Sequence, residues 1–317
     1  MSDLHFGVTP WRTDANGGAE ALAAQGERAE SLGFGSFWLP ESHFGARGSL
    51  PQPLLLLAAI ASRTQRIRLG TTSYLLPIRH PVQVAEEVAV LDRLSGGRVI
   101  LGIGRGFRSE LFSAFGVPSR EKRDRFGVAV DAMVRAWRGE PVAFDGAGSA
   151  PILLAPLPVQ QPHPPLWVAA FGPKAVEQAG RLGLPYLASP IEPLDVLIEN
   201  YERHRSVSPE ARSACVPVMR TVFVCDDADK ARNVREALAA QSAALLASRA
   251  PALRRSGAAD VAEVALVGSR AQVADAIAQH REALRLTHLI ARVQVPGAEP
   301  IEIEAALERL AELAATL

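Results

Sequence analysis

Cysteine is scarce in this sequence: Cys215 and Cys225 are the only two among 317 residues. Two thiols are too few for a disulfide framework or a zinc site built from cysteines, and such low usage is typical of a reducing compartment. The hydrophobic share of 48% is sufficient for a large core. We therefore expect a cytoplasmic protein that is held together by its core.

The sequence also lacks an excess of charge of one sign, since Lys plus Arg and Asp plus Glu both number 34. No long-range field favours nucleic acid or an anionic membrane surface. No apolar run approaches the roughly 18 residues of a membrane span, and the first residues, MSDLHFGVTPW, lack a basic segment followed by an apolar one. We expect neither membrane insertion nor export, and no nucleic-acid partner.

Short runs rich in β-branched and aromatic residues alternate with amphipathic stretches, a pattern that predicts βα units around a parallel sheet. The expected strands are His5–Thr9, Ser36–Glu41, Ile67–Tyr74, Val99–Gly104, Leu166–Ala170, Pro185–Ser189, Pro217–Cys225 and His288–Val295. The expected helices are Gly18–Leu32, Pro53–Ser62, Pro81–Leu94, Pro173–Leu182, Pro193–His204, Asp227–Ala247, Arg270–Leu284 and Ile301–Thr316.

Eight strands predict a single α/β domain over residues 1–317, a (β/α)8 TIM barrel. Two irregular segments interrupt it as insertions: Asp145–Pro165 after the fourth strand and Ala250–Val267 between the seventh and eighth. A doubly wound open sheet is the rival architecture. It expects a glycine-rich fingerprint after the first strand, where this chain has Thr9–Arg12.

In a TIM barrel the active site lies at the carboxyl ends of the strands, which directs attention to Arg105 and Gly172. Arg105 stands between two glycines after a buried strand, where its charge needs a phosphate or carboxylate partner; the alternative is a structural salt bridge to Glu41 or Glu110. Gly172 precedes a helix whose first N–H groups can seat a phosphate, or it is an ordinary helix start. The charge run 120–125 is interpreted as a solvated helix start, from which an arginine can still reach that phosphate.

His43 is the one histidine at a predicted strand end with a carboxylate, Glu41, two positions away. Period two places both side chains on one side of the strand, which indicates either a general acid or base or a hydrogen-bonded rim histidine. The other histidines lack metal-ligand spacing, so no metal is expected. The hydrolase elbow and the P-loop motif are absent from the sequence.

Four runs carry a family resemblance: Leu69–Pro77, His80–Asp92, Leu94–Arg98 and Leu101–Phe107. They strongly resemble the luciferase-like flavin monooxygenases. Supporting matches are Glu41–Phe44, Phe115–Gly116 ahead of Arg123, Leu166–Ala170 and Arg292–Gly297. The resemblance covers nearly the whole chain and is loosest in the two irregular segments.

The resemblance implies a barrel that binds reduced FMN, supplied by a separate flavin reductase, and uses O2 to oxygenate a small organic substrate. It makes Arg105 and Arg123 phosphate-binding arginines, and it places a non-proline cis peptide at Thr72–Ser73, beneath the flavin ring. The cofactor contacts expected from the resemblance and the strand ends together are Thr72, Ser73, Gly104, Arg105, Arg123, Ala170, Phe171 and Gly172.

One position departs from the family pattern. Bacterial luciferases carry two successive histidines after the strand-two glutamate, and Ser42 aligns with the first, catalytic one. Light emission is therefore not expected, and His43, which matches the second, is the catalytic candidate. Trp11, Tyr74 and Phe171 are candidates for a substrate pocket with an apolar mouth.

Two other functions are compatible with the sequence. One is hydride transfer with the deazaflavin F420 in place of FMN; the other is a non-catalytic flavin-binding or partner-subunit protein. Relatives dimerise through barrel helices, so we also expect a homodimer. The sequence does not name the substrate.

Overall fold

The structure, a computed structural model, describes residues 4–12, 18–44, 49–143, 150–207, 215–248 and 260–317, without the side chains of 244–248. The chain divides into two compact units. Unit 1 comprises residues 1–14, 28–38 and 167–317, and unit 2 comprises 15–27 and 39–166.

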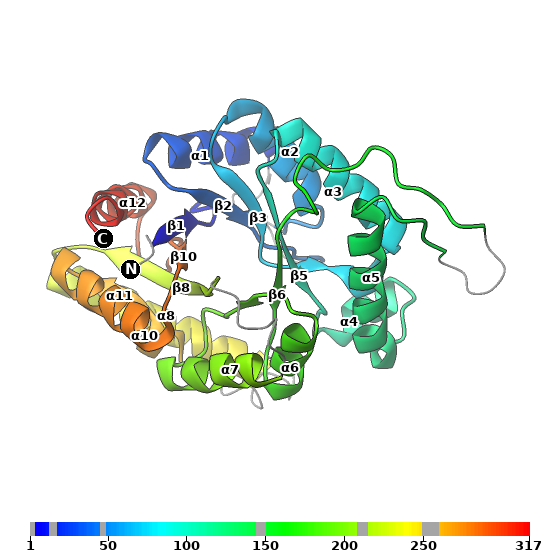
Figure 1. Cartoon of the computed structure of the whole chain (residues 1–317). Helices are drawn as coiled ribbons and strands as arrows, with labels where there is room; N and C mark the ends of the chain where they lie inside the picture. Colours follow the sequence, from blue (N-terminus) through cyan, green and yellow to red (C-terminus); the bar gives the residue numbers. More distant parts are fainter. Residues whose placement is uncertain (1–3, 13–17, 45–48, 144–149, 208–214, 249–259) are drawn as a thin grey trace. The chain divides into compact units, whose positions relative to one another are not determined.

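Unit 1 contains parallel strands that are each followed by a helix (Figure 1). Strand β10 pairs with β1 on one side and β8 on the other, β1 also pairs with β2, β8 with β9, and β6 with β7. The strands are β1 (His5–Val8), β2 (Ser36–Leu39), β6 (Leu166–Ala169), β7 (Tyr186–Leu187), β8 (Pro217–Val224), β9 (Leu266–Gly268) and β10 (His288–Arg292). The helices are α6 (Pro173–Arg181), α7 (Leu194–Ser206), α8 (Ala228–Ser248), α10 (Val261–Val264), α11 (Arg270–Leu284) and α12 (Pro300–Ala314).

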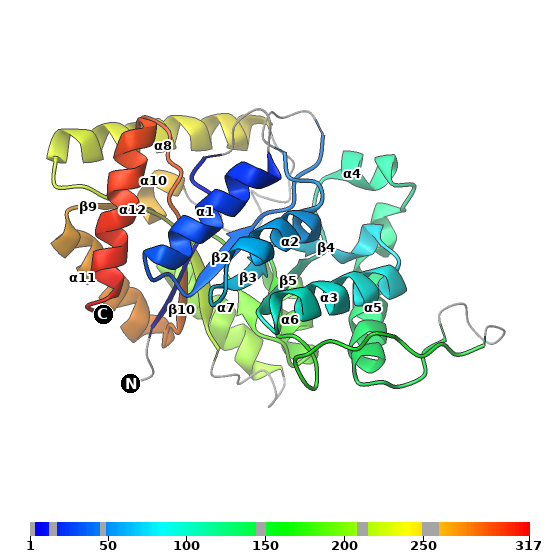
Figure 2. The ribbon, with the colours of Figure 1, turned by 90° about the horizontal axis from the view of Figure 1, so that it is seen from above.

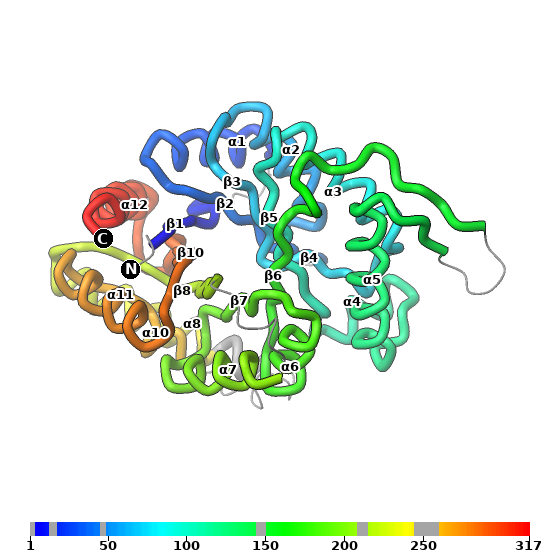
Figure 3. The backbone as a smooth tube through the Cα atoms, viewed as in Figure 1, coloured from blue at the N-terminus to red at the C-terminus, as the bar shows by residue number. Residues whose placement is uncertain are grey.

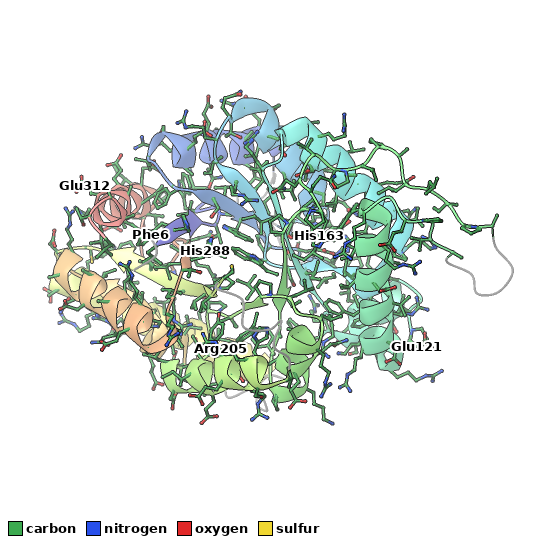
Figure 4. All side chains as sticks on the ribbon, in the orientation of Figure 1. Phe6, Glu121, His163, Arg205, His288 and Glu312 are labelled. Carbon is green, nitrogen blue, oxygen red and sulfur yellow. The ribbon has the colours of Figure 1, made fainter. Side chains whose placement is uncertain are left out.

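Stacked rings fill part of the interior of unit 1. Trp38 is fully buried and stacks on Trp167, with ring centroids 4.9 Å apart. Trp167 meets the edge of His288, the first residue of β10 (Figure 4), at 5.0 Å, and His288 contacts His5 at 4.8 Å. His5, Trp167 and His288 come from the amino-terminal half of their strands, so aromatic packing fills part of the interior near this end of unit 1.

A buried polar network joins β7, β8, α7 and α11 in unit 1. The Glu192 carboxylate accepts hydrogen bonds from the Tyr186 hydroxyl at 2.9 Å, the Ser189 N–H at 3.1 Å and the Asn200 amide at 2.9 Å. Burial raises the pKa of Glu192 to about 7, and these donors offset part of that rise.

Arg220, which is fully buried, belongs to the same network. Its guanidinium donates to the carbonyls of Ser189, Met219 and Glu192 and to Nε2 of His280. Burial lowers the pKa of Arg220 to about 10 and, with help from the Arg220 charge, that of His280 to about 4. Each nitrogen of this interior cation donates to an acceptor, as a buried charge requires.

Unit 2 repeats the strand–helix pattern. Strand β5 pairs in parallel with both β3 and β4. Helices α2, α3 and α5 follow one another as neighbours (Figure 2). The strands are β3 (Arg68–Thr71), β4 (Tyr74–Leu75) and β5 (Val99–Gly104), and the helices are α2 (Pro53–Arg63), η1 (Leu76–Ile78), α3 (Pro81–Ser95), α4 (Ser109–Ala114), η2 (Ser119–Glu121) and α5 (Lys122–Trp137). Helix α1 (Ala19–Ser31) has residues in both units.

Arg98, just before β5, ties the ends of two helices together. Its guanidinium donates to the carbonyls of Ala61, Thr64 and Ile67, to the Thr64 hydroxyl, and to the carbonyl of Ser95, at 2.6–3.0 Å. The carbonyls of Ala61, Thr64 and Ser95 lie at the carboxyl ends of α2 and α3, where carbonyls have no partner within the helix and a positive charge is favourable. This arginine of the recognised sequence pattern is therefore structural.

The described part of the segment between α5 and β6, residues 150–165, is fastened to unit 2 (Figure 3). The backbone N–H and side-chain amide of Gln160 donate to the buried carboxylate of Asp92 at 2.9 and 2.7 Å, and Arg68 donates to Gln160. Val142 and Ile152 form an antiparallel bridge. The contacts of Gln160 explain why a proline-rich stretch can be ordered here.

The structure corrects three of the sequence expectations. The third strand, expected over Ile67–Tyr74, is two strands, β3 and β4, separated by Thr72 and Ser73. The segment Ala250–Val267, expected to be irregular, ends in helix α10 and in strand β9, which pairs with β8. Helices α4 and α5 follow β5 where only a helix start was expected.

We predict that Arg98→Met lowers the free energy of unfolding by about 3 kcal/mol, because it leaves helix-end carbonyls without donors. Chemical denaturation of the purified protein measures this. Arg93→Met is the matched control, because Arg93 is exposed and donates to the Leu157 carbonyl at 3.3 Å. A loss in Arg98→Met no larger than in the control would contradict this account.

We predict that Glu192→Gln gains stability relative to the wild type as pH rises from about 4.5 to about 7. The folded-state pKa of Glu192 lies above its ordinary value, so its contribution is fully present below pH 4.5 and is lost as pH rises through 7. Glutamine does not titrate, and all other ionisable groups are shared. Urea unfolding of both proteins across this range checks the prediction, and a pH-independent difference would refute it.

Candidate active site

Glu41 organises the polar residues that follow β2. Its side chain is fully buried and accepts hydrogen bonds from the Leu75 N–H at 2.9 Å and from Arg79 at 2.8 Å. His43 Nε2 lies 2.5 Å from the same carboxylate. The expectation that Glu41 and His43 share one side is confirmed, although β2 ends at Leu39 and both residues lie beyond it. Arg79 is a partner that the sequence did not indicate.

The bond to Glu41 determines the chemistry that His43 can perform. A carboxylate accepts, so Nε2 carries the hydrogen of this bond and Nδ1 is the acceptor nitrogen of the neutral ring. The side chain of His43 is only 5% exposed. His43 is thus held in one orientation with Nδ1 available for a proton.

Two exposed aromatic rings stand beside His43. Phe115 meets the His43 ring edge-on at 5.2 Å, and Phe44 lies 5.6 Å from His43 and 6.0 Å from Phe115. Phe44 is 54% exposed and Phe115 42% exposed. We call these three residues the His43 aromatic cluster. Large apolar rings left open to solvent beside a fixed histidine are typical of ligand surfaces.

Ser42, which replaces the first histidine of the luciferase pattern, has a structural contact. Its hydroxyl accepts a hydrogen bond from the Leu50 N–H at 2.9 Å, and its own N–H donates to the Leu50 carbonyl at 3.1 Å. Ser42 therefore has a structural contact with Leu50, and a catalytic role for its neighbour His43 stays a prediction.

The Thr72–Ser73 peptide bond is cis, in agreement with the expectation from the resemblance. It lies between β3 and β4, and the Thr72 N–H donates to the Leu39 carbonyl. A Cβ on Gly104 would lie 2.2 Å from the Ser73 hydroxyl oxygen, so only glycine allows β5 to approach so closely. Gly104 thus positions Ser73; contact of Thr72, Ser73 or Gly104 with a cofactor stays a prediction.

Three positive side chains gather at the carboxyl end of β5. Arg105 is half-buried, and its pKa is lowered first by burial and then by the charge of Arg123. The pKa of Lys122 is lowered by burial and by the charges of Arg105 and Arg123. We call these three residues the cation cluster. Like charges held close together favour an anion among them.

Lys122 is the member of the cation cluster that sequence reasoning missed. Its ammonium donates to the Gly106 carbonyl at 3.3 Å and lies 5.5 Å from the centre of the Phe112 ring. The run 120–125 has the appearance of a solvated helix start, and Arg120 is indeed 86% exposed. The turn of chain that returns Lys122 to the Gly106 loop is a tertiary feature.

Tyr74 and Trp11, expected in a substrate pocket, both have structural partners. Tyr74 is 1% exposed, its hydroxyl donates to Glu87 at 2.7 Å, and Arg79 covers its ring at 3.9 Å. Burial raises the pKa of Tyr74, so it is a neutral phenol. Trp11 is 3% exposed and donates to Glu304 at 2.8 Å. These contacts are those of packed residues, and a substrate role for either stays a prediction.

The remaining expected cofactor residues lie in unit 1, between β6 and α6. Ala170 is buried and Phe171 is 39% exposed. Gly172 has a φ of +72° and immediately precedes Pro173, the first residue of α6. This left-handed glycine turns the chain into the helix; a cofactor role for the three residues stays a prediction.

Two other properties of the described residues bear on function. No three His, Cys, Asp or Glu side chains among them gather as a metal site would need. None of the helices in the described part of the chain is long and apolar enough to cross a membrane.

Similarity to known proteins bears on the function of this site. Flavin-dependent trigonelline monooxygenase, oxygenase component, of Acinetobacter baylyi is 29% identical over 64% of this chain and 59% of its own length. The chain thus spans little more than half the length of this relative.

Solved structures are similar over the whole chain. Monooxygenase RslO1 from Streptomyces bottropensis is 27% identical with a TM-score of 0.80, and 98% of each chain is covered. The oxygenating constituent of 3,6-diketocamphane monooxygenase from Pseudomonas putida, solved with FMN, is 21% identical with a TM-score of 0.80 over 100% of this chain and 99% of that one. These likenesses confirm the α/β TIM-barrel fold class. Residues 4–288 match the luciferase-like monooxygenase family, and the chain belongs to that family.

Proposed function

We propose that this chain is the oxygenase of a two-component flavin-dependent monooxygenase, which receives reduced FMN from a separate reductase and oxygenates a small organic substrate with O2. The family membership supports the class of enzyme. The observation that carries the choice of FMN is the cation cluster, which offers three positive charges to one terminal phosphate.

The residues of unit 2 suit this cofactor. Phosphate among Arg105, Lys122 and Arg123 would relieve the burial and mutual repulsion that lower the pKa values of Arg105 and Lys122. The flavin supplies the reaction with O2, while the protein binds, orients and excludes water. In this proposal Phe44 and Phe115 shield the reacting centre.

The roles of the other residues follow from their contacts. Glu41 and Arg79 hold His43 in place, and His43 exchanges a proton at Nδ1 during oxygen transfer. The relative named as the oxygenase component of a flavin-dependent monooxygenase supports a reductase partner. A cytoplasmic location and a homodimer are parts of the same proposal.

Anaerobic titration of the purified protein with reduced FMN and, separately, reduced F420 tests the proposal, followed by mixing with O2 while absorbance is recorded. Selective binding of FMN with O2-dependent spectral change is expected. Selective binding of F420 without reaction with O2 would assign the protein to hydride transfer. Binding of FMN without any substrate oxidation would favour a flavin-storing or partner-subunit protein.

We predict that Arg105→Met and Lys122→Met each weaken FMN binding by about 1.5–3 kcal/mol, because each removes a charge-assisted contact to phosphate. Fluorescence titration measures the affinity. Arg120→Met is the matched control, since it removes the same charge from an 86% exposed position two residues from Lys122. Riboflavin, which lacks the phosphate, should bind all four proteins equally. Equal losses for FMN and riboflavin would exclude a phosphate role for the cluster.

A further inference from the structure

Three neighbouring strands of unit 1 bring two threonines and an arginine together: Thr9 directly follows β1, Arg292 is the last residue of β10, and Thr221 lies within β8. In the parallel pairing of β10 with β8, Arg292 is in register with Thr221. On the other side of β10, Val8 of β1 is in register with Ala291, and the N–H of Thr9 donates to the Ala291 carbonyl, so Thr9 lies beside Arg292. Side chains in register on parallel strands share one face of the sheet. We call Thr9, Thr221 and Arg292 the β10 triad.

The face to which the β10 triad belongs follows from alternation along β8. Arg220 points toward α11, because it donates to His280 of that helix. The next residue, Thr221, therefore faces the opposite side of the sheet. The triad thus lies at the end of the unit where enzymes of this fold bind ligands.

Thr221 has a hydroxyl with unused hydrogen-bonding capacity. The residue is 1% exposed, and Oγ1 is buried without a hydrogen-bond partner in the described part of the chain. Every other buried side-chain oxygen or nitrogen of the described residues has a partner. An unmade buried hydrogen bond of this kind is destabilising, and it calls for a functional explanation.

The guanidinium of Arg292 also lacks hydrogen-bond partners among the residues that the structure describes, unlike the guanidinium groups of the structural arginines. Arg98 and Arg220 donate to four or five acceptors each. Arg292 is partly buried, and burial alone lowers its pKa. No hydrogen bond or ion pair joins its guanidinium to another described residue. A desolvated guanidinium in that condition favours an anionic ligand.

We propose that Arg292, Thr221 and Thr9 bind a carboxylate group of the organic substrate. The planar guanidinium offers two parallel N–H groups that match the two oxygens of a carboxylate, and the threonine hydroxyls donate from either side. This inference rests on the proposed function for the existence of an organic substrate. It adds that the substrate is an anion and that unit 1 recognises its charge.

Benzoate and its uncharged analogue benzamide are suitable probes, titrated calorimetrically into the whole protein without flavin. We expect benzoate to bind at least roughly tenfold more tightly than benzamide. Arg292→Met should abolish this preference, and Arg292→Lys should retain part of it. Thr221→Val, which keeps the shape and removes the hydroxyl, should weaken benzoate binding by roughly three- to tenfold.

Two controls separate the β10 triad from the cation cluster. Lys122→Met should leave the benzoate preference unchanged, whereas Arg292→Met should leave FMN affinity within about twofold of the wild type. If the wild type shows no benzoate preference, the FMN proposal still stands. If the protein does not bind FMN, the benzoate titration can still be interpreted. Inorganic phosphate is a third probe, and tighter binding of phosphate than of benzoate at Arg292 would overturn the assignment to a carboxylate.

Thermal unfolding without ligand adds a readout that a structural arginine would not give. Arg292→Met should raise the midpoint by about 1–3 °C, because it removes an unpaired, desolvated charge. A lower midpoint would indicate a structural role and overturn the proposal. So would unchanged benzoate affinity in Arg292→Met, loss of that affinity in Lys122→Met, or no benzoate binding at concentrations up to about 20 mM.

Discussion

The cost of removing a guanidinium from water is the constraint on which much of this structure depends. The chain meets it in two ways. Arg98 and Arg220 are surrounded by carbonyl acceptors, which ties helix ends and strands together inside each unit. At the carboxyl ends of β5 and β10, Arg105 and Arg292 remain partly exposed, and burial lowers the pKa of each. These two arginines are the ones to which we assign ligand-binding roles by proposal.

The regular part of the fold could be predicted from the sequence because its signals are local. Period and helix-start residues placed α11 at Arg270–Leu284, and they placed most other helices within two residues of their ends. The errors occur where structure depends on distant partners. Leu266–Gly268 is a strand only because β8 offers Val222–Val224 as a neighbour, and no period can be recognised in three residues.

The candidate site shows the same division. The pairing of Glu41 with His43 follows from a spacing of two residues, so the sequence indicated it, whereas Arg79 reaches Glu41 from a distant part of the chain. The sequence did not indicate Lys122, because it belongs to the charge run 120–125, in which other residues such as Arg120 are solvated. Conversely, Arg98 belongs to a run that identifies the family, yet its hydrogen bonds show that its role is to hold α2 and α3. A family pattern therefore records structural as well as functional requirements.

Ser42 illustrates why a single substitution at the site need not abolish its chemistry. A serine hydroxyl is a poor proton carrier near neutral pH, and here it is engaged with the Leu50 N–H. Its neighbour His43 has the opposite properties, since its Nε2 is fixed by Glu41 and the ring stands beside the exposed Phe115. In the proposed reaction, proton handling therefore depends on the second position of the pair. The carboxylate of Glu41 that orients His43 is the feature that supports this proposal.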